Sequence, residues 1–362
     1  MLTDRQTDRQ TDRQTDVAIV IPVYNAKKYI RKCLDSILKQ TFVNFCVVLV
    51  DDGSTDGCGK ICDLYKNRDS RIYVIHQQNK GSVEARKAGV LSEMAQSAPY
   101  IMFCDADDTL KPTALEILYQ MAQSYNADCV CGNMKKLWKN ISMQSHYKPD
   151  CFKISRERLY ENQEILDELY ISCFGISNYP VSLCAKLYNT QLLTKLINIK
   201  PIVRFMGDDL SVTMRLLPEV NRLVIIPDEI YNYRIGGNTS RFMPYMLDDF
   251  ISLYREKKIL IERYSMPQDA RYYMDMELMN VVISWLKMCY KQGHYGEKIQ
   301  SECERVCEIS EIREAAENLY ERGNIIAKIV YEKNTLDLKN YVLENIQKSR
   351  MRDFIVGILK RF

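Results

Sequence analysis

The sequence predicts an α/β fold with a mostly parallel, doubly wound sheet, followed by a helical C-terminal region. Continuous apolar runs such as Val17–Val23 and Phe45–Val50 are typical of strands that are buried on both faces. Segments with helical spacing of apolar residues separate these runs, and strands that alternate with helices indicate a parallel sheet. From about residue 240 the apolar runs give way to long amphipathic segments, which predict helices that pack on one another.

The expected elements follow one another with short connections. Strands are expected at residues 17–23, 45–50, 72–76, 100–104, 128–134 and 222–226. Helices are expected at 26–40, 60–67, 81–95 and 113–125, and the stretch 155–230 mixes helices with short strands. Further helices are expected at 247–264, 270–291, 297–322 and 336–362, the second and third of them ending near Gly293 and Gly323.

Composition divides the chain into three parts. Residues 3–16 repeat Thr-Asp-Arg-Gln three times and end in Thr-Asp, so residues 1–16 are expected to form a disordered tail. An α/β domain is expected over residues 17–237 and a helical domain over 238–362, with the boundary near Gly236-Gly237.

The bulk composition is that of an ordinary globular protein, with 362 residues, 46% hydrophobic and 27% charged residues. A net charge of +3 gives no reason to expect a nucleic-acid partner. The 13 cysteines form no CxxC pair and the three histidines are far apart in sequence, which is a poor zinc pattern. The odd cysteine count and the lack of a signal peptide lead us to expect a reducing cytoplasm, and no apolar run has the length for crossing a bilayer.

Three acidic clusters stand out because each is expected just past a run of apolar residues. They are Asp51-Asp52-Gly53-Ser54, Asp105-Ala106-Asp107-Asp108 and Gly207-Asp208-Asp209. Carboxylates at the C-terminal ends of parallel strands face the crevice where open α/β sheets bind ligands. Turn chemistry is the alternative for any single cluster, since Asp-Gly and Asp-Asp often end strands. Three clusters in this order favour a site for a cation or a nucleotide ligand.

Seven motifs then resemble those of family 2 glycosyltransferases with the GT-A fold. Four are the segment Val20–Asn25, the segment Val50–Asp56, the segment Asn79–Gly89, and Asp105-Ala106-Asp107-Asp108. The later ones are Cys184–Tyr188, Gly207–Leu210 and Tyr231–Arg234. The resemblance covers about residues 17–240 and implies a GT-A nucleotide-sugar-binding fold with sugar transfer from a nucleotide-diphosphate donor, expected to be a UDP-sugar.

The resemblance implies roles for residues near the donor. Asp107 is the expected metal ligand, and Asp105 is expected to contact the metal or the ribose. Asp52 is expected to hydrogen-bond the base in a pocket lined by Pro22 and Tyr24. A cation is required because two carboxylates would repel a diphosphate, and Mg²⁺ or Mn²⁺ suits such oxygen ligands.

Basic residues are expected to offset the diphosphate charge. Arg86, one turn or so into the helix opened by Gly81, is the first candidate, with a plain surface arginine as the alternative. Lys186 and Arg234 are further candidates for diphosphate or acceptor contacts, and structural pairing is the alternative for both. For Tyr24 the alternative is core packing, and for Asp108 it is capping of the helix after Pro112.

The third cluster is expected to supply the general base. An acceptor hydroxyl that attacks the anomeric carbon must lose a proton, and Asp209 matches the aspartate that takes it in the family. The family usually has Glu-Asp here, so Asp208 is one methylene shorter than its counterpart. One base together with metal-assisted departure of the leaving group implies a single displacement, hence an inverting hexosyl- or N-acetylhexosaminyltransferase.

Other classes lack their motifs in this sequence. A dinucleotide-binding oxidoreductase needs G-x-G-x-x-G and a P-loop enzyme needs G-x-x-x-x-G-K-[ST], and neither is present. A membrane polysaccharide synthase adds transmembrane helices and Gln-x-x-Arg-Trp. A non-catalytic nucleotide-sugar-binding module stays open as the alternative function, although such a module has no need for an acid pair at 208–209.

The two ends of the sequence suggest a bacterial surface glycan as the acceptor. Residues 348–362 combine basic and apolar residues, which suits a peripheral contact with the inner membrane; a helix docked on the protein itself is the alternative. Thr-Asp-Arg-Gln is what repeated ACAG encodes, and a four-base unit shifts the reading frame when one copy is lost. We therefore expect phase variation of an enzyme of lipopolysaccharide, lipooligosaccharide or capsule synthesis, a plain peptide tail being the alternative.

Overall fold

A computed structural model describes residues 15–138, 141–142, 152–176, 179–195, 200–204, 206–236 and 242–359. Contacts divide the chain into two units, the first comprising residues 1–162, 182–199 and 219–235 and the second 163–181, 200–218 and 236–362. This division differs from the expected boundary at residue 237, because 163–181 and 200–218 group with the C-terminal helices. Nearly all of the expected tail, residues 1–14, lies outside the described residues.

Half of the sheet in the first unit is parallel, as predicted. Its strands are β1 (Val17–Val23), β2 (Phe45–Asp52), β3 (Ile72–Gln77) and β4 (Tyr100–Phe103), in the order β3-β2-β1-β4. β1 pairs in parallel with both β2 and β4, and every residue of β2 and β4 is buried. The continuous apolar runs therefore have their expected cause, which is a strand covered on both faces.

The other half of the sheet is mixed. Beyond β4 the order continues β9 (Lys186–Asn189), β6 (Cys129–Trp138), β10 (Arg222–Arg234) and β5 (Thr109–Leu110). β9 runs antiparallel to β4 and β6, whereas β6 and β10 are parallel. β5 and β8 (Arg158–Glu161) pair antiparallel with β10, and β7 (Ile141–Ser142) with β6. The α/β fold is confirmed, and the parallel arrangement is strict only in the β3–β4 half.

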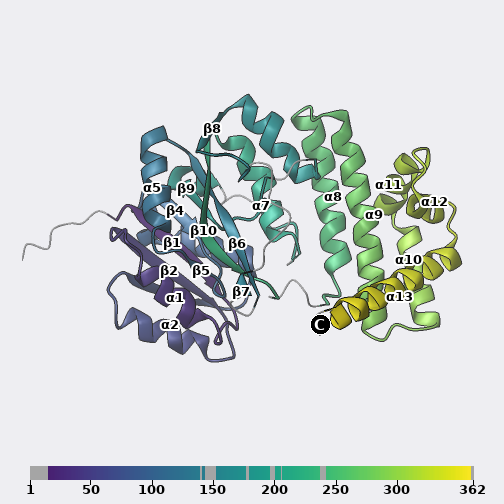
Figure 1. Cartoon of the computed structure of the whole chain (residues 1–362), viewed down its shortest axis with the longest axis horizontal. Coiled ribbons are helices and arrows are strands. Elements are labelled where there is room, and N and C mark those ends of the chain that lie inside the picture. The colour runs from purple at the N-terminus through teal and green to yellow at the C-terminus, as the bar shows by residue number, and fades with distance from the viewer. Residues whose placement is uncertain are drawn as a thin grey trace, which may run out of the picture. The chain divides into compact units, whose positions relative to one another are not determined.

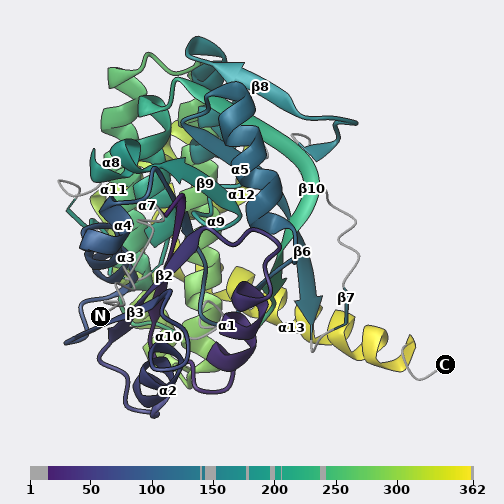
Figure 2. The ribbon, with the colours of Figure 1, turned by 90° about the vertical axis from the view of Figure 1, so that its left-hand side faces the viewer.

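Helices cover the sheet of the first unit. They are α1 (Ile30–Leu38), α2 (Cys58–Lys66), α3 (Ser82–Val90), α4 (Glu93–Gln96), α5 (Ala114–Tyr125) and α6 (Thr190–Thr194). Figure 1 labels α1, α2 and α5. Figure 2 shows α5 beside β6 and β10. α3 approaches β1 so closely that a Cβ on Gly89 would stand 2.3 Å from Cγ1 of Val20. Glycine is required there, and this packing fixes the helix that bears Arg86.

The second unit is helical. A π-helical turn (Ile165–Leu169) and a 3₁₀ turn (Tyr170–Phe174) precede α7 (Asp208–Leu216). The C-terminal helices are α8 (Met246–Arg263), α9 (Gln268–Lys291), α10 (Glu297–Glu308), α11 (Ser310–Tyr320), α12 (Ile325–Tyr331) and α13 (Thr335–Leu359). α8 and α9 run side by side (Figure 1), and α8 to α13 contribute to one hydrophobic core around Trp285.

Two helix predictions in this unit need correction. The helix expected over 297–322 is two helices, α10 and α11, because Ile309 adopts extended backbone angles between them. α12 was not expected at all. Gly293 and Gly323 do follow the ends of α9 and α11, as predicted. Their φ values of +93° and +74° lie in the left-handed region, which favours glycine.

Membrane contact stays a prediction. No helix within the described ranges has both the length and the apolar character needed to cross a bilayer. In the basic and apolar segment 348–362 only the side chain of Lys348 is described, and its Nζ lies 3.8 Å from Oε2 of Glu344 in α13.

Candidate active site

Arg86 and Asp105 form an ion pair at the C-terminal end of β4. Nη2 of Arg86 donates to Oδ1 of Asp105 at 2.9 Å. The arginine side chain is only 8% exposed, whereas that of Asp105 is 33% exposed. The close packing of Gly89 on Val20 brings α3 against β1, the neighbour of β4, so this pairing follows from the sheet order. The alternative of a plain surface arginine is excluded.

A second arginine pairs with Asp107. Nη2 of Arg234, the last residue of β10, donates to Oδ2 of Asp107. The same guanidinium lies 4.0 Å from the ring centroid of Tyr29, a cation–π contact. Its side chain is 24% exposed and that of Asp107 is 30% exposed. Arg234 is therefore held at the site by two partners, yet it stays within reach of solvent.

Asp108 anchors the loop that bears the other two aspartates. Its Oδ2 accepts the Tyr231 hydroxyl at 2.9 Å and its Oδ1 accepts the Arg234 amide at 2.7 Å. The Tyr231 hydroxyl also accepts the amide of Asp105 at 3.0 Å. The proposed helix-capping role is wrong, since α5 begins after Thr113 without a side-chain cap. Burial, and next the charge of Asp105, raise the pKa of Asp108 to about 8.

Asp52 holds the segment that opens α3. Its Oδ1 accepts Nε2 of Gln77 at 2.7 Å and the amide of Lys80 at 2.9 Å, and its Oδ2 accepts the amide of Gly81 at 2.9 Å. The residue is 3% exposed. A carboxylate oxygen accepts two hydrogen bonds, so Oδ2 retains capacity for one ligand donor. The contact with the base stays a prediction, and the hydrogen bonds give Asp52 an anchoring role in the protein itself.

Asn25 joins the ends of β1 and β2. Its side-chain Oδ1 accepts the backbone N–H groups of Thr55 at 2.9 Å and Asp56 at 3.2 Å. The backbone N–H of Asn25 donates to Oγ of Ser54 at 3.1 Å. The residue has φ of +51°, a conformation that asparagine tolerates better than most residues. The two loops at these strand ends are thereby held together.

His76 bridges Asp51 and Asp63. Its Nδ1 lies 2.9 Å from Oδ2 of Asp51, and its Nε2 lies 3.0 Å from Oδ1 of Asp63. Hydrogen bonds to Asp63 and then to Asp51 raise the pKa of His76 above 6.5. Asp51 also accepts the amide of Ser54 at 3.2 Å. The first acid of the first cluster is therefore structural, a role that sequence reasoning did not assign.

We expect His76→Gln to destabilise the protein in a pH-dependent way. A histidine with a raised folded-state pKa contributes stability that is fully present below the unfolded-state value, about 6.5, and lost as pH rises through the folded-state value. The melting temperature should therefore fall more at pH 6 than at pH 9. Tyr73→Gln on the same strand is the control, because it removes no imidazole. An equal loss for His76→Gln at both pH values would refute the bridge.

The remaining donor-site candidates differ in burial. Tyr24 is 47% exposed, which excludes the core-packing alternative, and Pro22 is half-buried in β1. Lys186 lies in β9 with 1% exposure, and its Nζ donates to the carbonyl oxygen of Ser182. This contact is the structural pairing considered for Lys186, and nothing in its burial favours a diphosphate contact.

Asp208 and Asp209 belong to the second unit, where they form the first turn of α7. Gly207 is the N-cap residue, with φ of +79°. Oγ of Ser211 donates to the carbonyl oxygen of Asp208 at 2.8 Å, and Oγ1 of Thr213 donates to that of Val181 at 2.7 Å. Negative charge in the first turn of a helix is stabilised by the helix dipole, so the acid pair suits this position.

The donor set near Asp105 fits a hard divalent cation. Mg²⁺ and Mn²⁺ are commonly bound through one or two carboxylates together with phosphate oxygens, and Asp105 and Asp107 are such carboxylates. The residues that the structure describes contain no group of three or more His, Cys, Asp or Glu side chains arranged around a metal position. Two protein ligands completed by the substrate remain compatible with that finding. A cation on Asp107 would compete with Arg234.

Tyr231 is the functional residue that sequence reasoning missed. In the sequence it is one residue of the Tyr231–Arg234 motif, and in the structure the hydroxyl of this fully buried tyrosine joins the loop after β4 to β10. The hydroxyl of a buried tyrosine usually has a hydrogen-bond partner. A tyrosine in a strand otherwise expected to be buried is therefore a sequence signal for such a polar link.

Comparisons with known proteins point to glycosyltransferases. Residues 18–182 match Glycosyl transferase family 2. Glycosyltransferase GlyG of Streptococcus pneumoniae is 43% identical over 118 residues, which is 32% of this chain and 38% of that protein. Glycosyltransferase GlyA of the same organism is 34% identical over 226 residues, or 62% of this chain and 31% of that protein. The chain thus spans about a third of the length of these two relatives.

The fold is also that of a solved structure. S. aureus TarS 1-349, crystallised in complex with UDP-GlcNAc, is 20% identical and superposes with a TM-score of 0.65 over 92% of each chain. This likeness extends the GT-A-like fold with its C-terminal helices to nearly the whole chain. The match over residues 18–182 is to the family that the motifs predicted.

Proposed function

We propose that this chain is an inverting, metal-dependent glycosyltransferase that uses a nucleotide-diphosphate sugar. The observation that supports this most is the pairing of Asp105 with Arg86 and of Asp107 with Arg234, at the C-terminal end of β4. β4 lies beside β1, where the strand order reverses, and open α/β sheets bind ligands at such a switch point. Two carboxylates and two guanidinium groups suit a diphosphate with its cation.

Each side chain has a distinct task in this proposal. Arg86 is buried and fixed, so it offsets diphosphate charge without moving. Arg234 is more exposed and exchanges its contact with Asp107 for one with the donor. Tyr24 offers an exposed ring for the base beside Pro22, and Asp52 accepts a hydrogen bond from the base through Oδ2. Lys186 is left out of donor binding because of its burial.

Departure of the nucleoside diphosphate needs charge stabilisation at the leaving oxygen. Mg²⁺ or Mn²⁺ held by Asp107 and Asp105 would supply it as a Lewis acid. Asp108 and Tyr231 hold the loop in place, so the two ligands keep their position. No general acid is then required among the residues of the chain.

Asp209 is proposed as the general base for the acceptor hydroxyl, and Asp208 as its supporting acid. Proton removal by a positioned carboxylate in a single displacement inverts the anomeric carbon. UDP-sugars are the proposed donors, a proposal to which the UDP-GlcNAc complex of the TarS structure adds weight. The proposed acceptor is a hydroxyl of a bacterial surface glycan or glycolipid, reached on the cytoplasmic face of the inner membrane.

Release of nucleoside diphosphate from a panel of nucleotide sugars tests the proposal. We expect one donor, a UDP-sugar, to be consumed when Mn²⁺ or Mg²⁺ is present, and consumption to stop in excess chelator. Binding of a donor without consumption, with and without candidate glycan acceptors, would instead support the nucleotide-sugar-binding module. Consumption that is unaffected by chelator would remove the metal from the proposal.

A further inference from the structure

Asp249 of α8 binds the segment that leads into the acid pair. Its Oδ1 accepts the amide of Arg204 at 2.8 Å, and its Oδ2 accepts the amide of Met206 at 2.9 Å. The residue is 3% exposed, and these backbone amides supply hydrogen bonds to both oxygens of its buried carboxyl group. Met206 immediately precedes Gly207, the N-cap residue of α7. A single carboxylate therefore fixes the backbone two residues before the acid pair.

Leu253, one turn further along α8, packs against Gly207. A Cβ on Gly207 would stand 2.5 Å from Cδ1 of Leu253, and the φ of +79° independently favours glycine. Another turn along, Glu256 accepts Nε of Arg215 in α7 at 2.8 Å. Residues 249, 253 and 256 are spaced by four and three, so they lie on one face of α8. Residues on that face of α8 therefore contact α7 at both ends, at Gly207 before its first turn and at Arg215 in its last turn.

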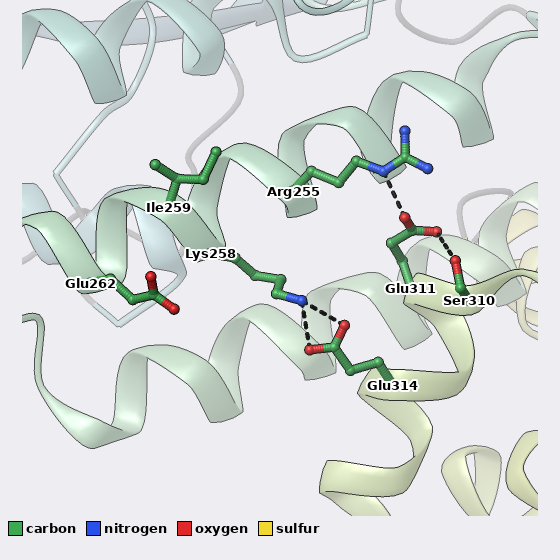
Figure 3. Close-up of a pocket in the computed structure, with 7 residues that line it drawn as sticks. All are labelled: Arg255, Lys258, Ile259, Glu262, Ser310, Glu311 and Glu314. Atoms are coloured by element: carbon green, nitrogen blue, oxygen red, sulfur yellow. Dashed lines mark hydrogen bonds and ion pairs between the residues drawn. The ribbon is translucent and has the colours of Figure 1, made fainter.

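Other residues of α8 contact the neighbouring helices α11 and α9. Arg255 donates to Glu311 at 2.6 Å and Lys258 to Glu314 at 2.6 Å, which ties α8 to α11 (Figure 3). The hydroxyl of Tyr254 donates to Asp275 of α9 at 2.6 Å. The cavity of about 280 Å³ drawn in Figure 3 is lined by these paired charges. α8 is thus a fixed support for α7.

We propose that Asp249 is a positioning residue for catalysis: through the amides of Arg204 and Met206 it sets where α7 begins and hence where the carboxylate of Asp209 stands. This inference rests on the proposed function, in which Asp209 is the base. A general base works only at a defined place, and misplacement by about 1 Å costs on the order of 10² in rate. The C-terminal helices then belong to the catalytic apparatus.

The test is a double-mutant cycle between Asp249→Asn and Asp209→Asn, with kcat and the donor KM measured for each protein. Asparagine has one acceptor oxygen and turns an NH₂ group toward the other amide, so the loop shifts. We expect Asp249→Asn to lower kcat by up to about 10²-fold with the donor KM unchanged. In the Asp209→Asn background it should have no further effect, because the group it positions is already gone.

Asp248→Asn is the matched control, since its side chain is 61% exposed and its contact is a 3.6 Å pair with Arg305. It makes the same charge change on the same helix and should leave kcat as it is. If Asp249→Asn loses the circular dichroism spectrum of the wild type, Glu256→Gln replaces it in the cycle. Additive losses, or an unchanged kcat, would overturn the inference. A wild type that consumes no donor would instead overturn the proposed function.

Discussion

Asp209→Asn should abolish nearly all sugar transfer while the enzyme still binds its donor. Asparagine keeps the size and position of the side chain in the first turn of α7 but cannot accept a proton. A positioned general base contributes roughly 10²–10⁴-fold, so kcat should fall by that factor. Initial rates of nucleoside diphosphate release, together with calorimetric titration of the donor, measure the two quantities separately.

Asp208→Asn is the neighbouring comparison for this prediction. Its backbone carbonyl already accepts Oγ of Ser211, so the substitution leaves the helix start intact. We expect the milder loss of the two. The assignment of the base would be wrong if Asp208→Asn proved the more damaging change or if Asp209→Asn also lost donor binding.

Asp107→Ala should remove the metal dependence of the reaction together with its rate. The side chain is 30% exposed and pairs with Arg234, so its loss opens no cavity in the core. Loss of a preorganised electrostatic contact at a leaving group typically costs about 10²–10³ in kcat. The measurement is kcat over a series of Mn²⁺ concentrations, with melting temperature as the check on folding.

Asp63→Asn serves as the control for Asp107→Ala. Its side chain is 50% exposed and contacts His76, away from the β4 loop in the chain, so only stability should change. A wild-type response to Mn²⁺ in Asp107→Ala would show that the cation binds elsewhere.

The parallel half of the sheet could be predicted because its central strands appear in the sequence as continuous apolar runs. Val17–Val23 and Phe45–Val50 are apolar throughout, and a continuous apolar run without polar alternation indicates a strand that is buried on both faces. The antiparallel half could not be read this way. β5 has two residues, and its pairing with β10 joins Leu110 to Tyr231 across a long stretch of chain.

The break between α10 and α11 could not be predicted, because the apolar residues keep helical spacing on both sides of it. Cys303, Val306 and Cys307 are buried on one side of it, and Ile312 and Ala315 on the other. Helical spacing fails only in the step from 307 to 312, and no glycine or proline marks it. A single extended residue, Ile309, therefore left almost no trace in the pattern.

The site was predictable in its acids and less so in its partners. Asp105 and Asp107 were found from their place after a buried run. Their pairing with Arg86 and Arg234, and the link from Tyr231 to Asp108, depend on sheet order and on the packing of Gly89 against Val20. The support that α8 gives to α7 could not be read from the sequence, because Asp248-Asp249 looks like any acidic first turn of an amphipathic helix.

In the proposed reaction this chain displaces a nucleoside diphosphate directly from a sugar, with inversion at the anomeric carbon. Proton NMR of the slow hydrolysis of an α-linked UDP-sugar tests it without knowledge of the acceptor. We expect the β anomer of the free sugar to form first, before mutarotation, and chelator to suppress the signal. Early formation of the α anomer would contradict the single displacement with Asp209 as base.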